Sequence, residues 1–336
     1  MDSTRGEYLS SSAFEHLRVV TFANVRFIHM MVNFIAHMHH SIHLHFPFEV
    51  RTLDDVTFMV CMRSLPLALG GRCFREPCCN ESQPFRGFPS MHFSDGEISI
   101  GMRLVEQVLM YKVQFLVNEF ARGTPDPIVI LDTTALVSSA ACFKAWASHP
   151  EDIVTTIEYP PGCPAGAGSR MGLVLNTGAT LYRPAARRFL EKVLDKRAQK
   201  WEHKTNYRFH CFEQELVNQQ LVLDGFTWKT FYVDGFTTPS DEGSNVHNLS
   251  LHFLPWRVWP RDFRPVLKWT NYTDRRKPGE PHANYVNVIG QPVADKGLTR
   301  REGGCLFHPW IFSKYDNASQ SSYADVYLRA GLWHLR

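Results

Sequence analysis

Apolar residues along the chain alternate between short continuous runs and longer stretches with the spacing of an amphipathic helix. Short runs predict strands, and helical spacing predicts helices. In the first half, strands are expected at 19–24, 45–51 and 128–131. Helices are expected from the end of the first strand to about 39, from 55 to 64 and from about 98 to 121. Strands that alternate with helices indicate an α/β fold with a mostly parallel central sheet covered on both faces.

The second half begins with the same alternation and then becomes less regular. Strands are expected at 152–158 and 171–175, and helices at 184–203 and 212–223. The rest of the chain has few helical patterns and many aromatic residues, so we expect an elaborated C-terminal half. A segment at about 70–97, rich in Gly, Pro, Cys and Ser, predicts an irregular insertion. Because no linker divides the chain, we expect a flexible leader at 1–17 and one domain at 18–336.

The composition is that of an ordinary globular protein, with 44% hydrophobic and 21% charged residues. A formal net charge of +3 is small, and nucleic-acid-binding proteins concentrate far more Lys and Arg, so nucleic acid is not an expected partner. Eight cysteines in 336 residues do not predict a disulfide scaffold. Cys61 and Cys142 lie in apolar segments and are expected to be buried as small hydrophobic residues, whereas Cys73 lies in loop-like sequence where a disulfide can form in an oxidising compartment.

No segment of the sequence predicts a membrane span. The N-terminal residues are polar, and neither a signal peptide nor a membrane anchor is seen behind them. Residues 27–48 lack Asp, Glu, Lys and Arg, but they contain several histidines that are too costly to bury in hydrocarbon. These histidines include His37, His39 and His40. Since no acid or repeated metal-ligand spacing accompanies them, packing and surface roles are favoured over a metal site.

Polar residues that can carry chemistry follow the predicted elements in a fixed order. Asp132 ends the apolar run 128–131, and ligands of open α/β sheets bind at the carboxyl ends of strands. A polar turn is expected at 175–178, and a helix opens with Glu213 and Gln214. The usual nucleotide motifs are absent, since there is no P-loop, no complete dinucleotide fingerprint and no nucleophile elbow.

The succession of these segments resembles the nucleotide-diphospho-sugar transferase family of eukaryotes (glycosyltransferase family 77). The resemblance covers about residues 19–296 and rests on several short segments in order, none of them specific alone. The segments are Thr21-Phe22-Ala23-Asn24, Leu53-Asp54-Asp55, Lys112, the strand ending at Asp132, Asn176-Thr177-Gly178, Glu213-Gln214 with Asn218, and His282-Ala283-Asn284 with Gly290 and Lys296.

The resemblance implies a GT-A-like, Rossmann-type nucleotide-sugar-binding domain that moves a hexose or pentose from a UDP-sugar to a glycan or glycoprotein acceptor. It implies a retaining outcome, a Mn²⁺ or Mg²⁺ cofactor and a place in the Golgi lumen. Such a cation stabilises the charge that develops on the leaving diphosphate. By the resemblance Asp132 and His282 are metal ligands, and the donor-binding residues are Thr21, Asp54, Lys112, Asp132 and Lys296. The catalytic candidates are Asn176, Glu213 and Gln214.

The sequence departs from the family pattern at one position, where Thr134 replaces the second Asp of the Asp-x-Asp motif. A neutral hydroxyl is a poorer ligand than a carboxylate for a hard cation. An impaired pseudoenzyme that binds nucleotide or glycan without turnover is therefore the alternative function, and a metal-independent transferase is a third. Several residues also have plain structural explanations, since Asp54 suits a helix cap, Lys112 a solvated helix face and Asn176 an ordinary turn.

Overall fold

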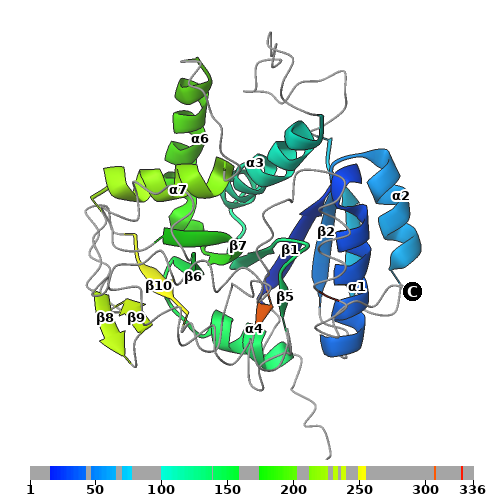
Figure 1. The fold of residues 1–336 in the computed structure, drawn as a ribbon, viewed down its shortest axis with the longest axis horizontal. Coiled ribbons are helices and arrows are strands. Elements are labelled where there is room, and N and C mark those ends of the chain that lie inside the picture. The colour runs from blue at the N-terminus through cyan, green and yellow to red at the C-terminus, as the bar shows by residue number, and fades with distance from the viewer. Residues whose placement is uncertain are drawn as a thin grey trace, which may run out of the picture.

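The computed structural model describes residues 16–42, 47–65, 70–77, 100–137, 139–158, 174–202, 212–225, 230–233, 236–239, 249–254, 306–307 and 327. Its centre is a seven-stranded sheet in the order β10-β6-β7-β4-β1-β2-β3 (Figure 1). The strands are β1 Arg18–Ala23, β2 Phe48–Thr52, β3 Gly71–Arg75, β4 Ile128–Leu131, β6 Ile153–Glu158, β7 Val174–Tyr182 and β10 Leu251–Phe253. Only β7 runs against its neighbours, so the expected mostly parallel sheet is confirmed.

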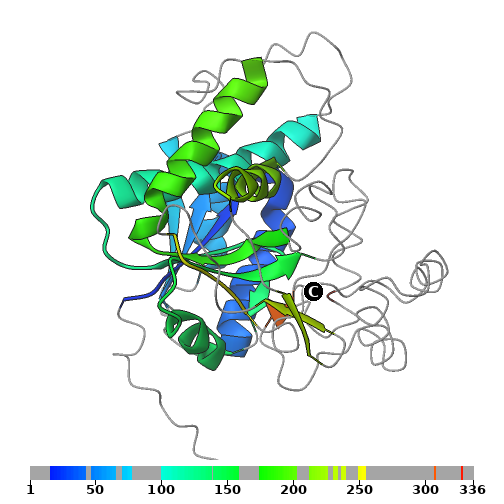
Figure 2. The same cartoon turned by 90° about the vertical axis from the view of Figure 1, so that its left-hand side faces the viewer.

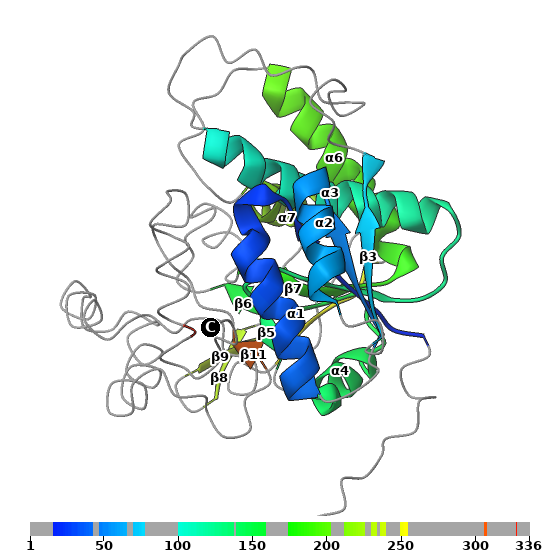
Figure 3. The same ribbon diagram turned by 90° about the vertical axis from the view of Figure 1, so that its right-hand side faces the viewer.

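Helices cover both faces of this sheet. The helices are α1 Ile28–Ile42, α2 Asp55–Ser64, α3 Ile100–Ala121, α4 Ala140–Ala147, α6 Arg187–Glu202 and α7 Phe212–Leu223. Short 3₁₀ turns, η2 Val25–Phe27 and η4 Pro184–Ala186, lead into α1 and α6. Figures 1 and 2 show α6 and α4 on opposite sides of the sheet, and Figure 3 shows α1 and α2 side by side in front of it.

Two hydrophobic clusters separate the helices into these layers. One cluster joins α1, α2 and α4 to the sheet, and the other joins α3, α6 and α7 to it. Strand β1 shows the cause, because Val19 and Ala23 belong to the first cluster whereas Val20 and Phe22 belong to the second. Side chains of a strand alternate between faces, so a strand that is covered on both faces reads as a continuous apolar run.

Smaller elements attach C-terminal residues to the first half of the chain. Strand β5 Leu136–Val137 pairs antiparallel with β11 Leu306–Phe307. Strands β8 Thr230–Val233 and β9 Phe236–Pro239 form a separate two-stranded sheet and, in the part of the chain that the structure describes, do not make such a connection. The Tyr327 side chain is buried and donates a hydrogen bond to the main-chain oxygen of Thr134. Within the described residues, no helix combines the length and the apolar character that a membrane crossing requires.

The start of the expected insertion at 70–97 belongs to the sheet. Residues Gly71–Arg75 form β3, which pairs parallel with β2, so this part of the prediction is wrong. A disulfide joins Cys73 to Cys61 of α2. Cys142 is disulfide-bonded as well. The expected burial of Cys61 and Cys142 is confirmed, whereas a disulfide was expected only at loop-like positions such as Cys73. Burial in apolar surroundings does not distinguish a thiol from a disulfide.

The expected polar turn at 175–178 lies inside a strand. Strand β7 begins at Val174, and the β6–β7 register shifts at Thr155 and Thr156, whose partners are Thr180 and Asn176. Residues 177–179 therefore form a bulge in β7. A bulge lets a strand carry extra residues without losing the pairing on either side. The Asn and Gly that indicated a turn serve this bulge instead.

A network of ion pairs lies between α3 and the strands β1 and β2. The Glu49 carboxylate accepts hydrogen bonds from Arg18 Nε at 2.9 Å and from Arg51 Nε at 3.0 Å. Arg18 also pairs with Glu119 of α3, and Arg51 pairs with Glu76 at 2.7 Å. Burial alone would raise the pKa of Glu49, but the hydrogen bonds and charges of the two arginines hold that pKa below its ordinary value.

Candidate functional site

The carboxyl end of β4 presents Asp132 at the edge of the sheet. The Asp132 main-chain N–H donates to the oxygen of Gly178 in the β7 bulge at 2.7 Å, and its own oxygen accepts from Ala135 N at 2.8 Å. The second bond closes a tight turn that directs the chain away from the sheet. The Asp132 side chain is 27% exposed, whereas the flanking Leu131 and Thr133 are buried.

Lys112 of α3 lies between two carboxylates. Its Nζ is 2.7 Å from Asp132 Oδ1 and 2.7 Å from Glu213 Oε1. The side chains of Lys112 and Glu213 are 3% and 4% exposed. Burial alone would lower the pKa of Lys112, but the charges of the two carboxylates and the hydrogen bonds to them outweigh it, so the pKa lies above its ordinary value. Lys112 is therefore a charged, buried residue, and the prediction of a solvated helix face is wrong.

The β7 bulge meets the first turn of α7 through side-chain hydrogen bonds. Thr177 Oγ1 donates to Glu213 Oε1 at 3.0 Å, and Asn176 Nδ2 donates to Gln214 Oε1 at 3.1 Å. The Asn176 Oδ1 atom accepts from Gly178 N at 3.0 Å, which fixes the bulge internally. The side chains of Asn176, Thr177, Glu213 and Gln214 are all buried. Asp132 is therefore the most exposed of these interacting residues.

Asn218 anchors the same helix one turn later. Its Oδ1 accepts from Leu175 N at 2.8 Å, and its Nδ2 donates to Leu175 O at 3.0 Å. The amide of Asn218 thus pairs with β7 as a neighbouring strand would. This contact sets the height of α7 relative to the sheet, and it brings Glu213 and Gln214 to the end of β4.

The structure therefore brings together five predicted residues, Lys112, Asp132, Asn176, Glu213 and Gln214, from α3, β4, β7 and α7. We call these five residues and Thr177 the β4-end cluster. Thr177 was not among the predicted site residues. The signal for it was present, because it lies between Asn176 and Gly178 in a segment that carries the family resemblance.

Thr21 and Asp54 lie outside the β4-end cluster. Thr21 is fully buried in β1, and among the described residues its Oγ1 has no hydrogen-bond partner. By strand alternation it faces the α1 side of the sheet, as Val19 and Ala23 do, whereas Lys112 comes from α3 on the other face. Asp54 caps α2, because its carboxylate accepts from Thr57 N and from Val25 N, each at 2.7 Å.

The structure describes Thr134, where the chain departs from the family pattern, but not two of the predicted site residues. His282 and Lys296 lie outside the described residues. Thr134 sits in the turn after Asp132 and is 7% exposed. Within the described part of the chain, Asp132 does not belong to any group of three side chains arranged to hold a metal ion.

Solved structures share this architecture. The bifunctional glycosyltransferase WbbM superposes with a TM-score of 0.51 at 10% sequence identity, over 94% of this chain and 52% of WbbM. The fold is GT-A-like. The galactosyltransferase LgtC, solved with donor and acceptor sugar analogues, gives a TM-score of 0.47 at 11% identity over 95% of this chain and 97% of LgtC. GlyE of Streptococcus pneumoniae gives 0.47 at 11% identity over 93% of this chain and 60% of GlyE.

The likeness lies in the fold and not in the sequence. No known protein family and no curated protein matches the chain by sequence. The chain spans about half the length of WbbM, of which 52% is covered. The expected GT-A-like α/β fold is therefore confirmed, whereas the particular family named from the sequence motifs stays a prediction.

Proposed function

We propose that this protein is a glycosyltransferase that moves a sugar from a nucleotide-sugar donor, a UDP-sugar by the family resemblance, to a glycan or glycoprotein acceptor. The observation that carries the proposal is the β4-end cluster, in which Asp132 is held by Lys112 at the carboxyl edge of a GT-A-like sheet. Ligands of open α/β sheets bind at this edge. In the proposed reaction Asp132 contacts the donor, and the buried members of the cluster position it.

The charges of the cluster define what it can bind. One ammonium group faces two carboxylates, so the formal charge of Lys112, Asp132 and Glu213 together is negative. A negative site does not attract a diphosphate unaided, because like charges repel across a short distance. The proposal therefore requires positive charge from elsewhere, and Mn²⁺ or Mg²⁺, with His282 and Lys296, is our hypothesis for its source.

The described residues do not by themselves form a site for that cation. Mn²⁺ and Mg²⁺ bind several oxygen or nitrogen ligands, and here Asp132 offers one carboxylate that already pairs with Lys112. Glu213 is buried and pairs with the same lysine. We therefore assign no step of the reaction to the metal. The retaining outcome, by displacement on the face of the leaving diphosphate, is likewise proposed from the resemblance.

A thermal-shift titration with UDP, in the presence and absence of Mn²⁺, tests the proposal. We expect a rise in Tm that requires both ligands, since a ligand at 100 times its Kd stabilises by about 2.7 kcal/mol. Asp132→Asn is expected to abolish the rise. Asp55→Asn is the matched control, because Asp55 is an exposed carboxylate, 84% accessible, that pairs with Arg75 on α2's side of the sheet.

Each outcome of the titration decides between hypotheses. An equal rise in wild type and Asp132→Asn contradicts the assigned site. No rise in folded wild type contradicts the transferase proposal. If UDP binds, incubation with UDP-sugars and Mn²⁺ must release or transfer sugar, and its failure to do so supports the pseudoenzyme.

The pseudoenzyme is the second candidate, and Thr134 is the observation that favours it. The position that would carry a second carboxylate holds a buried threonine in a turn whose main-chain oxygen is bonded to Tyr327. Thr134→Asp tests this alternative. A gain of Mn²⁺-dependent sugar release indicates that the natural protein is impaired, whereas no gain in an active protein shows that Thr134 does not limit turnover.

We also propose that the protein works in an oxidising compartment, the Golgi lumen by the family resemblance. The Cys61–Cys73 disulfide and the disulfide-bonded state of Cys142 support this location. Disulfides persist in the secretory pathway and are rare in the cytosol. Thiol alkylation of the protein extracted from cells, with and without prior reduction, tests it. Complete labelling of Cys61 and Cys73 without reduction contradicts it.

A further inference from the structure

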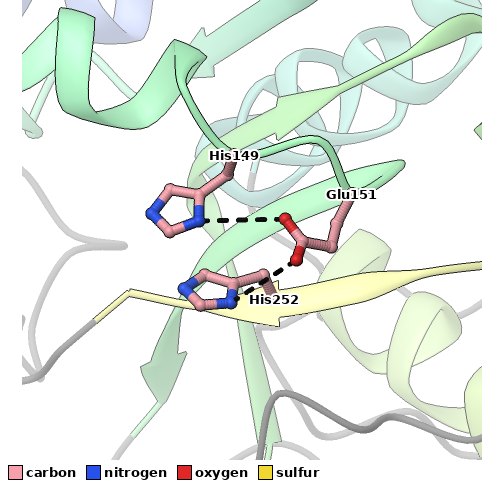
Figure 4. Close-up of side chains that lie close together, drawn as sticks. All are labelled: His149, Glu151 and His252. Atoms are coloured by element: carbon pink, nitrogen blue, oxygen red, sulfur yellow. Dashed lines mark ion pairs between the residues drawn. The ribbon is translucent and has the colours of Figure 1, made fainter.

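A second cluster of ligand-type side chains lies at the far end of the sheet from Asp132. His149 follows α4, Glu151 precedes β6, and His252 lies in β10 (Figure 4). One ligand atom from each lies within 4.8 Å of the other two. His149 Nδ1 is 3.8 Å from Glu151 Oε2, and His252 Nδ1 is 3.9 Å from Glu151 Oε1.

The strand register separates this cluster from the β4-end cluster. Ile128, the first residue of β4, and Ile153, the first residue of β6, both pair with Tyr182 of β7. Glu151, which precedes Ile153, therefore lies at the amino edge of the sheet. Asp132, which follows β4, lies at the opposite, carboxyl edge. A ligand of one cluster cannot be shared with the other.

The distances within the cluster favour a shared ligand over direct pairing. Separations of 3.8 and 3.9 Å are too long for hydrogen bonds. Glu151 Oε2 is buried, and among the described residues it has no hydrogen-bond partner. Two atoms that each lie about 2.1 Å from one tetrahedral zinc are roughly 3.4 Å apart, so these spacings need little adjustment to enclose an ion.

The backbone around the cluster is held in place. The Arg183 side chain donates to three main-chain oxygens, those of Ala147, His149 and Glu151. This fixes the short segment that carries two of the three side chains. Immediately before β10, Ser250 N donates to Asp152 Oδ2 at 2.8 Å, and Asp152 N donates to Ser250 Oγ at 3.0 Å. The two sides of the cluster are thus preorganised independently of any bound ion.

We propose that His149, Glu151 and His252 form a zinc site that fastens the edge strand β10 to the segment between α4 and β6. Two imidazoles and one carboxylate are a ligand set that zinc accepts, and a solvent molecule supplies the fourth ligand. The exposed fractions of the three side chains, 28%, 20% and 13%, allow solvent to reach the ion. The two rings, which are stacked with centroids 3.9 Å apart, coordinate through the Nδ1 atoms that already face Glu151.

Zinc binding to the full chain, after removal of metal with EDTA, tests the proposal. Competition with a chromophoric chelator, using Zn²⁺ alone as the probe, is expected to show one tight site. His149→Ala, His252→Ala and Glu151→Gln are each expected to weaken it at least ~10-fold, because loss of a group that merely orients a ligand costs about 10- to 100-fold. With Co²⁺ in place of Zn²⁺, the absorption bands of a tetrahedral site are expected in wild type and lost in Glu151→Gln.

Two controls exclude other zinc-binding positions. The double variant His39→Ala/His40→Ala changes exposed histidines at the end of α1, and Asp132→Asn changes the β4-end cluster. Both are expected to bind zinc as wild type does. Loss of zinc from either control, no tight site in wild type, or unchanged binding in the His149 and His252 variants overturns the proposal. Circular dichroism identifies any variant that fails to fold. If the alanine variants fail to fold, zinc binding by Glu151→Gln, which preserves side-chain size, tests the proposal.

Discussion

Two networks of charged residues contact α3, and they differ in the number of cations that face their carboxylates. In the first, Glu49 receives hydrogen bonds from two arginines, which in turn pair with Glu119 and Glu76. In the second, a single cation, Lys112, serves both Asp132 and Glu213. The first network is closed, whereas the second leaves a carboxylate 27% exposed at the carboxyl edge of the sheet.

The difference distinguishes a structural network from a site. Both networks contact the same helix, and their cations differ in burial, since Arg18 and Arg51 are 22% and 14% exposed whereas Lys112 is 3% exposed. In the first, Arg122 also pairs with Glu119 at 2.7 Å, so three guanidiniums, each with a planar set of donors, face three carboxylates. In the second, one ammonium group lies between two carboxylates, so these three groups together carry a negative charge that a ligand of positive charge would balance. One variant in each network tests this distinction, and a third, at the cap of α2, tests the limits of the donor site.

Removal of the shared cation is expected to have the largest effect. Lys112→Met leaves Asp132 and Glu213 facing each other without a counter-charge, and loss of one partner from a buried ion pair costs about 3–5 kcal/mol. Urea unfolding followed by tryptophan fluorescence measures this loss. Adding Glu213→Gln to Lys112→Met is expected to recover part of it. Destabilisation of less than ~1 kcal/mol would show that Lys112 is not held as described.

Neutralising the closed network is expected to have a smaller effect, and one that depends on pH. Glu49→Gln weakens hydrogen bonds to charged groups, which are worth about 1.5–3 kcal/mol. Because the pKa of Glu49 is held below its ordinary value, the stability that it supplies is present above the pKa of an unfolded glutamate, about 4.3. This stability is lost as the pH falls through the folded pKa.

Unfolding free energies measured from pH 7 down to pH 3 check the sign of this effect. Wild type is expected to lose stability below about pH 4 more steeply than Glu49→Gln does. UDP binding at pH 7 is expected to be the same in both proteins. A Glu49→Gln variant that loses UDP binding while staying folded would contradict the assignment of this network to structure alone.

Removal of a helix cap is expected to have the smallest effect. Asp54→Ala deletes the acceptor for Thr57 N and Val25 N, and loss of an N-cap costs about 0.5–2 kcal/mol. Since Asp54 lies outside the β4-end cluster, the affinity for UDP is expected to stay unchanged. Differential scanning calorimetry measures the stability, and titration calorimetry measures the affinity for UDP. A loss of UDP affinity with little loss of stability would indicate that Asp54 contacts the donor.

The elements of the fold were largely predictable because each depends on local pattern. Helices α2 and α7 have the expected bounds, Asp55–Ser64 and Phe212–Leu223, and β4 has its expected apolar run. The direction of β7 was not predictable. Asn176-Thr177-Gly178 has turn composition, and only pairing with β4 and β6 shows that the segment is a bulge in a strand.

The β4-end cluster was predictable as a set of residues but not as a set of contacts. The order of the motifs pointed to Lys112, Asp132, Asn176, Glu213 and Gln214 together. The position of Lys112 between two carboxylates depends on how α3 packs on the sheet, which no local pattern encodes. The histidines of the proposed zinc site illustrate the same limit. The histidine-rich segment near His37 is visible in the sequence, whereas His149 and His252 meet only through β6–β10 pairing.

The position of β10 in the sheet has a consequence for the order of folding. This strand has three residues, Leu251–Phe253, and Asp152 and Ser250 at its junction with β6 are 98 positions apart in the chain. Closing so long a loop is entropically costly, and only the short pairing of β10 with β6 offsets that cost among the described strands. A chain leaving the ribosome can therefore assemble β1, β2 and β4 long before β10 has been synthesised. In the mature protein, the β10 amides are expected to exchange with solvent sooner than those of β4.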